Sequence, residues 1–301
     1  MRDCIIVGGG PAGLSAGIYM ARFLRDTVLF EAGRPRAHRI PRTRNLPGYP
    51  DGIEGPELLD QMRRQLAHYE GREIEIRRET VSGAQRIEGG FRVEGEGGAV
   101  EGRSLILATG VTNRSPRIAE ALHDEGVARG LIRYCPICDA YEVRGQKVAI
   151  LGSGPHAVAE GRFVRHYAED VTVVRPEHAP LDNDGEKALS QAGLKILPSH
   201  RRDIRLDDDG IVVEMEDGRE ERFDTLYVAL GTDPHSDLAR DLGAELTEAG
   251  CIPVDAHCET SIKGLFAIGD VVAGLDQIAY GMGHAAVACT EIHNRLPGRR
   301  G

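Results

Sequence analysis

The chain has 301 residues, of which 41% are hydrophobic and 28% are charged, and its formal net charge is −10. This composition is typical of a globular protein with room for two domains. Because the chain is acidic and has no apolar run long enough to cross a bilayer, we expect no nucleic-acid partner, no membrane association and a cytoplasmic location.

The amino-terminal segment predicts a nucleotide-binding βαβ unit. An apolar run at residues 4–7 is followed by Gly8-Gly-Gly-Pro-Ala-Gly13, a helix-forming stretch at 14–25 and a second apolar run at 27–30 that ends at Glu31. In a G-x-G-x-x-G loop, the first glycine permits a tight turn and the second lets the backbone approach a pyrophosphate at the positive end of the helix. The third glycine allows close packing of helix and strand, and Glu31 lies where a carboxylate can accept hydrogen bonds from a ribose.

The same plan recurs in the middle of the chain. A strand at 147–151 precedes Gly152-Ser-Gly154-Pro-His-Ala157, and we expect a helix at 157–167 and a strand at 170–174. Each loop is followed by a turn-rich, alternating segment, at 84–100 and 203–216, which predicts an antiparallel meander. Each meander leads into an apolar strand that ends in a glycine turn, at 105–110 and 226–231. The chain therefore contains an internal repeat of a whole nucleotide-binding domain.

The carboxyl-terminal part has no nucleotide loop of its own. It contains an apolar segment at 260–270 and a predicted helix at 279–296. We expect it to complete the first domain, so that residues 1–113 and 244–301 form one domain and residues 114–243 are inserted into it, with crossings near 111–116 and 241–245. The predicted fold is α/β, with two Rossmann-like three-layer (β/β/α) dinucleotide-binding domains.

Two cysteines lie one helical turn apart just before the second glycine loop, in Arg133-Tyr-Cys-Pro-Ile-Cys-Asp139. This spacing suits a redox dithiol or half of a zinc site. A zinc site would need a second set of ligands, and the candidates fit no common zinc spacing: Cys251, His257 and Cys258. We therefore favour a redox pair and expect no metal. The other cysteines are expected to be unpaired, with Cys4 and Cys289 in the core and Cys251 and Cys258 near the surface.

Several motifs together resemble one enzyme family. Two glycine loops, an Ala108-Thr-Gly110 turn and Gly264-Leu-Phe-Ala-Ile-Gly-Asp270 resemble the two-dinucleotide flavoprotein reductases. The cysteine pair in the second domain and the segment 45–58 resemble the low-molecular-weight thioredoxin reductases, and the resemblance covers nearly the whole chain. It implies a homodimeric, FAD-dependent disulfide oxidoreductase that passes electrons from NADPH or NADH through FAD and the cysteine pair to its acceptor. The acceptor would be thioredoxin, a similar small dithiol protein or a small-molecule disulfide.

Roles for individual residues follow from the residues and from the resemblance. A thiol at a helix start is favoured as a thiolate, so we expect Cys135 to attack the partner disulfide, Cys138, one turn deeper, to face the flavin, and Asp139 to move protons. The implied FAD contacts are Gly8, Gly10, Pro11, Ala12, Gly13, Glu31, Asn45, Ala108, Thr109, Gly110, Gly269, Asp270, Gln277 and Ile278. The implied nicotinamide contacts are Gly152, Gly154 and Arg175. His156, inside the second loop, either contacts a cofactor phosphate or is a solvent-exposed loop residue. Since both the nicotinamide and the dithiol must reach one flavin, the second domain would rotate between two states.

Two segments depart from the family pattern. Residues 33–44 are rich in arginine where typical members have Gly-Gly-Gln-Leu, and this loop could bind an FAD phosphate, bind an acidic partner, or be simply solvated. Residues 174–178 keep one arginine, Arg175, and add Glu177 where typical members have a His-Arg-Arg clamp for the 2′-phosphate of NADPH. The nicotinamide preference therefore stays open. A dithiol oxidase that uses oxygen, a reductase fed by another donor, and a redox sensor with a vestigial flavin site are the alternatives.

Overall fold

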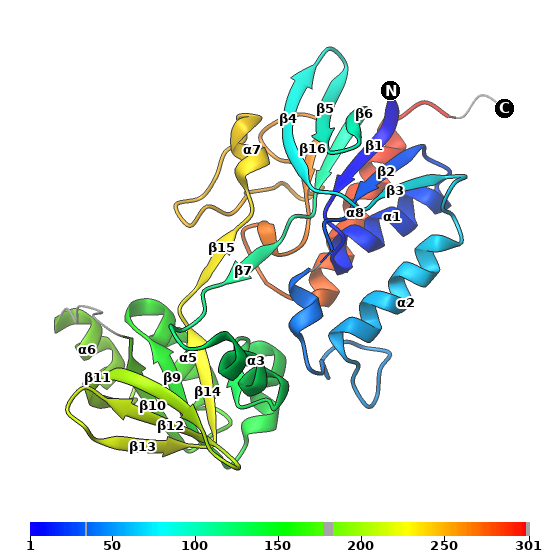
Figure 1. Cartoon of the computed structure of the whole chain (residues 1–301). Helices are drawn as coiled ribbons and strands as arrows, with labels where there is room; N and C mark the ends of the chain where they lie inside the picture. Colours follow the sequence, from blue (N-terminus) through cyan, green and yellow to red (C-terminus); the bar gives the residue numbers. More distant parts are fainter. Residues whose placement is uncertain (34, 177–182, 299–301) are drawn as a thin grey trace.

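A computed structural model describes residues 1–33, 35–176 and 183–298. The chain forms two seven-stranded sheets, and a small two-stranded sheet lies between them (Figure 1). The sheets carry the two glycine loops at the ends of their strands, so the predicted α/β fold with two dinucleotide-binding domains is confirmed. No helix in the described part of the chain is both long and apolar enough to span a membrane.

The first sheet has the strand order β3-β2-β1-β6-β5-β4, and β16 pairs with β6. Its strands are β1 (Arg2–Val7), β2 (Thr27–Phe30), β3 (Ile74–Arg77), β4 (Val81–Ile87), β5 (Gly90–Gly95), β6 (Gly98–Leu107) and β16 (Leu265–Ala267). Neighbouring side chains on a strand point to opposite faces, so Ile6 and Ile106 pack against helices while Ile5 and Leu105 pack under the meander of β4–β6. The helices on this sheet are α1 (Pro11–Arg22), α2 (Gly55–Ala67) and α8 (Ile278–Arg295), with the short η1 (Arg36–Arg39) and η3 (Gly269–Val271) beside them.

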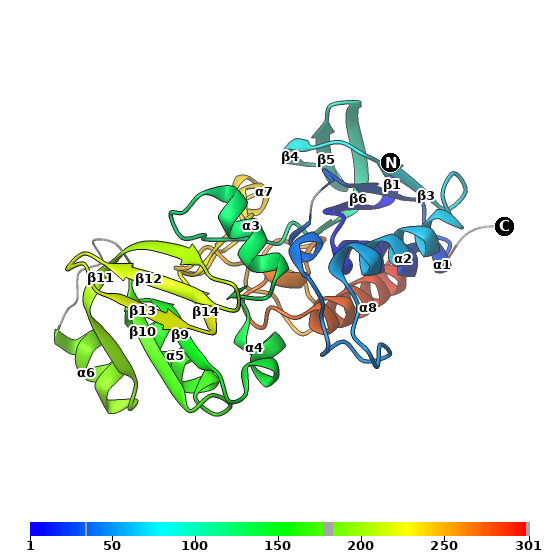
Figure 2. The ribbon, with the colours of Figure 1, turned by 60° about the horizontal axis from the view of Figure 1, so that its bottom comes forward.

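The second sheet has the order β13-β12-β11-β10-β9-β14-β8. Its strands are β8 (Ile132–Arg133), β9 (Lys147–Gly152), β10 (Asp170–Arg175), β11 (Lys195–Leu206), β12 (Ile211–Met215), β13 (Glu220–Phe223) and β14 (Thr225–Ala229). Ala149 and Leu226 face the meander of β11–β13 and helix α3 (Glu120–Ala128), while Ile150 and Tyr227 face α5 (Gly154–Val164) and α6 (Asn183–Gln191). Figure 2 shows α6 and α3 on opposite sides of these strands. The remaining short helices are α4 (Pro136–Asp139) and η2 (Ala140–Val143).

The predicted elements differ from the observed ones mainly at their ends. Helix α1 ends at Arg22, three residues early, because Leu24 adopts a left-handed φ of 58° that an α-helix does not continue through. Helix α5 begins at Gly154, before the predicted start, since Pro155 is well tolerated in a first helical turn. The predicted location of Cys258 was wrong: it is only 3% exposed and packs in the first core.

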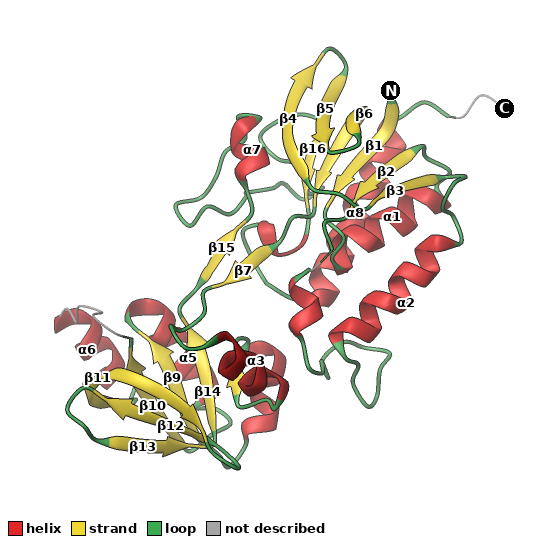
Figure 3. Cartoon of the chain, in the orientation of Figure 1, coloured by secondary structure: helices red, strands yellow, loops and turns green. Residues whose placement is uncertain are grey.

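The chain crosses between the sheets through β7 (Val111–Asn113) and β15 (Thr232–Pro234), which pair in antiparallel fashion (Figure 3). The first crossing, through β7, lies within residues 111–116. The second lies earlier than the predicted 241–245, because Ala239 and Leu242, in and just after α7 (Asp237–Asp241), are buried in the same core as β5 and β6. The segment that includes α7 therefore packs on the first sheet.

Candidate active site

The predicted redox pair forms a disulfide between Cys135 and Cys138, whose Cα atoms are 5.2 Å apart. The pair follows β8, and the four-residue helix α4 begins directly after Cys135. The two sulfurs are bonded to each other and not presented as metal ligands. In the part of the chain that the structure describes, no cluster of three His, Cys, Asp or Glu side chains is placed to hold a metal ion.

The disulfide lies against the first domain through Gln277, the residue that precedes α8. The Nε2 atom of Gln277 is 3.1 Å from Sγ of Cys138 and 3.5 Å from Sγ of Cys135. The Oε1 atom of Gln277 accepts a hydrogen bond of 2.7 Å from Nδ2 of Asn45. Gln277 and Asn45, both predicted near the flavin, are thus brought together with the two sulfurs.

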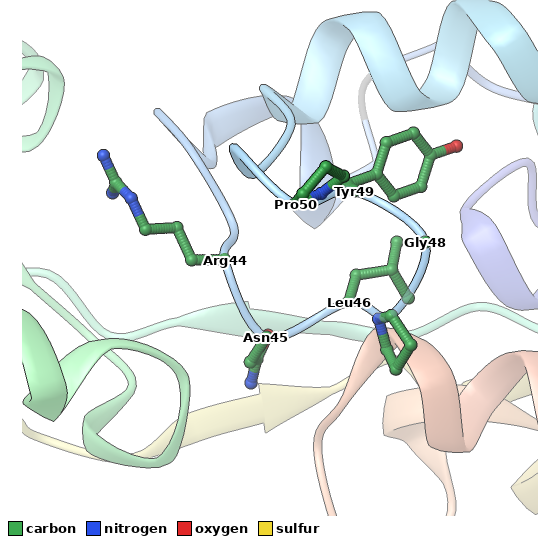
Figure 4. A pocket seen from close by; sticks show the side chains of 7 residues that line it. Arg44, Asn45, Leu46, Gly48, Tyr49 and Pro50 are labelled. Atoms are coloured by element: carbon green, nitrogen blue, oxygen red, sulfur yellow. The ribbon is translucent and has the colours of Figure 1, made fainter.

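Asn45 belongs to a loop that forms a shallow hollow. The hollow is lined by residues 44–50, and Figure 4 shows the side chains of Arg44, Asn45, Leu46 and Tyr49 around it. Because Asn45 is both exposed and bonded to Gln277, this loop offers a ligand a polar surface next to the disulfide.

Asp139, the predicted proton carrier, is held between two side chains. Its Oδ2 accepts a hydrogen bond of 2.8 Å from Nη1 of Arg133, and its Oδ1 accepts one of 2.7 Å from the hydroxyl of Tyr227. Burial, reinforced by the charge of Asp139, raises the pKa of Tyr227 well above its usual range, so this phenol keeps its proton and acts as a donor. No motif in the sequence pointed to Tyr227, although a tyrosine in a fully buried strand needs a partner for its hydroxyl.

The first glycine loop shows which of its glycines the protein itself requires. A Cβ on Gly8 would be 2.1 Å from the carbonyl oxygen of Ala108, and one on Gly13 would be 1.8 Å from the carbonyl oxygen of Gly8. A Cβ on Gly10 would meet only the Cβ of Pro35, at 3.6 Å. Protein packing therefore requires Gly8 and Gly13, whereas Gly10 leaves an open approach at the start of α1, as a bound pyrophosphate needs.

The start of α8 completes this cradle. A Cβ on Gly269 would lie 3.0 Å from the Cβ of Ala12, and one on Gly281 would lie 3.3 Å from the same atom. Ile278 is the first residue of α8, and Pro11 is the first residue of α1. The amino-terminal ends of two long helices thus converge, which favours a negatively charged group between them.

Glu31, the residue expected to bind a ribose, lies beside the first glycine loop. Its buried side chain lies directly against Gly9 and forms an ion pair with Arg63. Both Arg63 nitrogens that bond to Glu31 use Oε1. None of the hydrogen bonds from described side chains to Glu31 uses Oε2, so this oxygen can accept hydrogen bonds from ribose hydroxyls. The residues present fit the ADP part of FAD.

The Ala108–Gly110 turn is fixed by a residue that the sequence analysis did not single out. The hydroxyl of Thr109 donates to the carbonyl oxygen of His235 at 2.6 Å, and Nδ1 of His235 is 2.9 Å from the carbonyl oxygen of Thr109. The amide of His235 also donates to the carbonyl of Gly110 at 3.0 Å. His235 follows β15, so the segment returning from the second domain holds this turn beside the first glycine loop.

Asp270 is paired with Arg36, from the arginine-rich loop. Nη1 of Arg36 is 2.9 Å from Oδ2 of Asp270 and 2.8 Å from Oδ2 of Asp276. Nη2 of Arg36 donates to Oδ1 of Asn113, in β7, at 2.7 Å. Burial and the nearby Asp270 raise the pKa of Asp276, while Arg36 opposes this rise. At least this arginine of the loop is thus not simply solvated, and it joins the predicted FAD site to the crossing strand.

The second glycine loop lies between β9 and α5, and Arg175, at the end of β10, bonds to another part of the protein. A Cβ on Gly152 would be 2.7 Å from the carbonyl oxygen of Ala229, whereas Gly154 has a φ of +62° and open space around it. His156 is exposed in the first turn of α5. Arg175 donates to the carbonyl oxygen of Leu197 from Nε at 3.2 Å and from Nη2 at 3.0 Å. Glu177, in the segment that departs from the family pattern, lies outside the described residues.

Residues 2–291 match the pyridine nucleotide-disulphide oxidoreductase family, so the chain belongs to this family. It is 32% identical over 286 residues to a thioredoxin reductase of Mycolicibacterium smegmatis, covering 90% of this chain and 89% of the relative. The chain is therefore a flavoprotein disulfide reductase, and the prediction of FAD and a nicotinamide nucleotide as cofactors is confirmed.

Two solved structures of similar sequence identity superpose on this chain to different extents. A thioredoxin reductase from Streptococcus pyogenes, 28% identical, superposes with a TM-score of 0.84 and covers 98% of this chain and 97% of that structure. A Lactococcus lactis thioredoxin reductase described as being in an FR conformation is 29% identical, but superposes with a TM-score of only 0.62 at 98% coverage of both chains. Since identity and coverage are nearly equal, the difference indicates another arrangement of the same domains.

Proposed function

We propose that this enzyme passes electrons from NAD(P)H through FAD to the Cys135–Cys138 disulfide, and from there to thioredoxin or a similar small dithiol protein. The observation that carries this proposal is the contact of the disulfide with Gln277, at the place where the starts of α1 and α8 form the FAD cradle. A disulfide at that place is positioned to receive two electrons from a flavin.

We assign the cysteine roles from their distances to the first domain. Cys138 is the sulfur closer to Gln277 and is the proposed flavin-side thiol, whereas Cys135 attacks the partner disulfide. Asp139 accepts hydrogen bonds from Tyr227 and Arg133 and is the proposed site of proton exchange near the leaving thiolate. FAD, when bound, supplies the two-electron carrier between nicotinamide and disulfide.

The surface around the pair supports a protein as acceptor. Ile137, between the two cysteines, is 51% exposed, and Tyr141, just after Asp139, is 60% exposed. The guanidinium of Arg144 lies 3.6 Å from the centre of the Tyr141 ring, which holds this ring in place. Exposed apolar and aromatic side chains beside a reactive sulfur are typical of protein-docking surfaces.

We further propose a homodimer in the cytoplasm. Tyr280 and Val287, which lie seven residues apart on α8, are 42% and 40% exposed, so one face of this helix presents apolar surface to a second copy. The free thiols Cys4, Cys258 and Cys289 suit a reducing compartment, where NAD(P)H is also supplied. Light scattering of the wild type and Val287→Glu tests the dimer: the variant should be monomeric.

The donor is tested by anaerobic mixing with NADPH and, separately, with NADH, while the flavin absorbance is followed. Bleaching by either nucleotide, followed by electron transfer to thioredoxin, supports the reductase. Arg175 is already bonded to Leu197, so we propose that NADPH has little advantage over NADH. Flavin bleaching by a small dithiol and not by either nucleotide, together with oxygen consumption in a separate aerobic assay with the dithiol, would replace this function by the dithiol oxidase. A Cys138→Ser variant that still turns over at the wild-type rate would refute the dithiol mechanism.

A further inference from the structure

We propose that Gln277 is a positioning residue that stabilises the reduced cysteine pair by donating a hydrogen bond from Nε2 to the sulfur of Cys138. Because Gln277 belongs to the first domain and the pair to the second, this bond makes the reduction potential of the pair depend on the domain arrangement. The inference rests on the proposed function in one respect, namely that Cys135 and Cys138 are the redox-active pair.

The orientation of the Gln277 amide is fixed by a chain of hydrogen bonds. The backbone of Thr43 pairs with Ile53 in both directions, at 2.8 and 2.9 Å. The buried Thr43 hydroxyl donates to Oδ1 of Asn45 at 2.9 Å, which turns Nδ2 of Asn45 towards Oε1 of Gln277, at 2.7 Å. With Oε1 committed as an acceptor, the Nε2 amino group must face the sulfurs. It lies nearer to Cys138, at 3.1 Å, than to Cys135, at 3.5 Å.

Such a donor distinguishes the oxidised pair from the reduced pair. A neutral disulfide sulfur is a weak acceptor, whereas a thiolate accepts a charge-assisted hydrogen bond. Reduction adds two electrons to the S–S bond, and the uptake of one proton leaves one thiol and one thiolate. The electrons come from reduced flavin in the proposed cycle and from glutathione in the test below. The Gln277 amide therefore stabilises the reduced form and favours Cys138 as the thiolate.

The contact also links redox state to domain arrangement. Its donor and acceptor lie on opposite sides of the crossing formed by β7 and β15, so a rotation about this crossing breaks it. With the bond formed, the pair is more easily reduced, and with the bond broken it is a stronger reductant for a partner disulfide. Linkage is reciprocal: the reduced pair must favour the arrangement that keeps the bond by the same factor.

The test is a redox titration of the FAD-loaded enzyme in glutathione buffers without nicotinamide or thioredoxin. The mixture is quenched by alkylation, and the reduced fraction of the Cys135–Cys138 peptide is measured by mass spectrometry. For Gln277→Leu we expect the equilibrium constant for reduction to fall about tenfold, which corresponds to about 30 mV. The pH at which Cys138 is half-alkylated should rise by about one unit. Gln85→Leu, at an exposed position of β4, is the matched control and should titrate like the wild type.

A second variant guards against loss of the fold. Asn45→Ala removes the group that orients Gln277 and should shift the potential in the same direction, but by less. Flavin content and circular dichroism report whether each variant is intact. An intact Gln277→Leu that titrates like the wild type overturns this inference while leaving the proposed function standing. A wild-type pair that does not titrate at all overturns the proposed function and this inference with it.

Discussion

Replacing Glu160 by glutamine should stabilise the second domain in a pH-dependent way. Glu160 lies on α5, and its Oε2 atom is buried without a hydrogen-bond partner in the described structure. Burial raises its pKa from 4.5 to about 8. Between these two values the unfolded chain has lost this proton and the folded chain still holds it, so the free energy of unfolding falls as pH rises. Below pH 4.5, ionisation of this carboxyl group costs no stability, and above about pH 8 the stability lost through its ionisation reaches its full value.

The size of the effect follows from the same two pKa values. At about 1.4 kcal/mol per pKa unit, the two values limit the free energy of unfolding lost at high pH to roughly 5 kcal/mol. Because Glu160 is only partly buried, we expect Glu160→Gln to gain about 2–4 kcal/mol at pH 8 and less than about 1 kcal/mol at pH 5.

Urea denaturation at the two pH values, followed by circular dichroism without nicotinamide, measures this gain. Glu169→Gln, at an exposed position of the same domain, is the control and should change stability by less than about 0.5 kcal/mol at either pH. An equal gain at pH 5 and pH 8, or no gain at pH 8, would refute the reasoning, because the effect would then not arise from ionisation of Glu160.

Two further predictions concern the site itself. Tyr227→Phe removes the hydroxyl that donates to Asp139, so it should cost about 1 kcal/mol of stability and slow reduction of the disulfide roughly threefold to tenfold in single-turnover absorbance measurements. An unchanged rate would show that this hydrogen bond does not serve catalysis. Gly10→Ala should leave the circular dichroism spectrum intact but weaken FAD binding at least about tenfold, since its methyl group would fill ligand space. Gly8→Ala should lose the fold as well as FAD, because its Cβ would collide with backbone. Flavin fluorescence on titration with FAD distinguishes the two glycine variants.

Features encoded by local sequence were predictable. Each glycine loop follows a buried apolar strand, so β1, β9 and the helices after them could be located to within a few residues. The second crossing could not, because Ala239 and Leu242 join the first core only through tertiary packing that no local pattern shows. The family resemblance could place Gln277 near a flavin, but its contact with Cys138 spans 139 residues of sequence.

The hydrogen-bond and ion-pair partners of the charged site residues could not be predicted from the sequence either. Asp139 bonds to Tyr227, 88 residues further along the chain, and Arg36 reaches Asp270 across 234 residues. The arginine-rich loop contains several arginines that could pair with Asp270, and the sequence does not indicate which of them does so. What selects Arg36 is the close approach of η1 to the start of α8, which depends on the packing of both against the first sheet.

The topology of the second sheet explains why the cysteine pair directly precedes the second glycine loop. Strands β8, β14 and β9 are parallel neighbours, with Leu226 opposite both Ile132 and Ala149, so their carboxyl ends lie at one edge of the sheet. The disulfide follows β8 at this edge, and the glycine loop follows β9 at the same edge. In parallel α/β sheets this edge is where ligands bind. The pair and the second glycine loop are thus fixed relative to each other on one sheet. When Gln277 holds the sulfurs at the first domain, the second glycine loop cannot occupy the same place. We propose that this loop binds the nicotinamide, so the nucleotide and the disulfide must reach the flavin in turn.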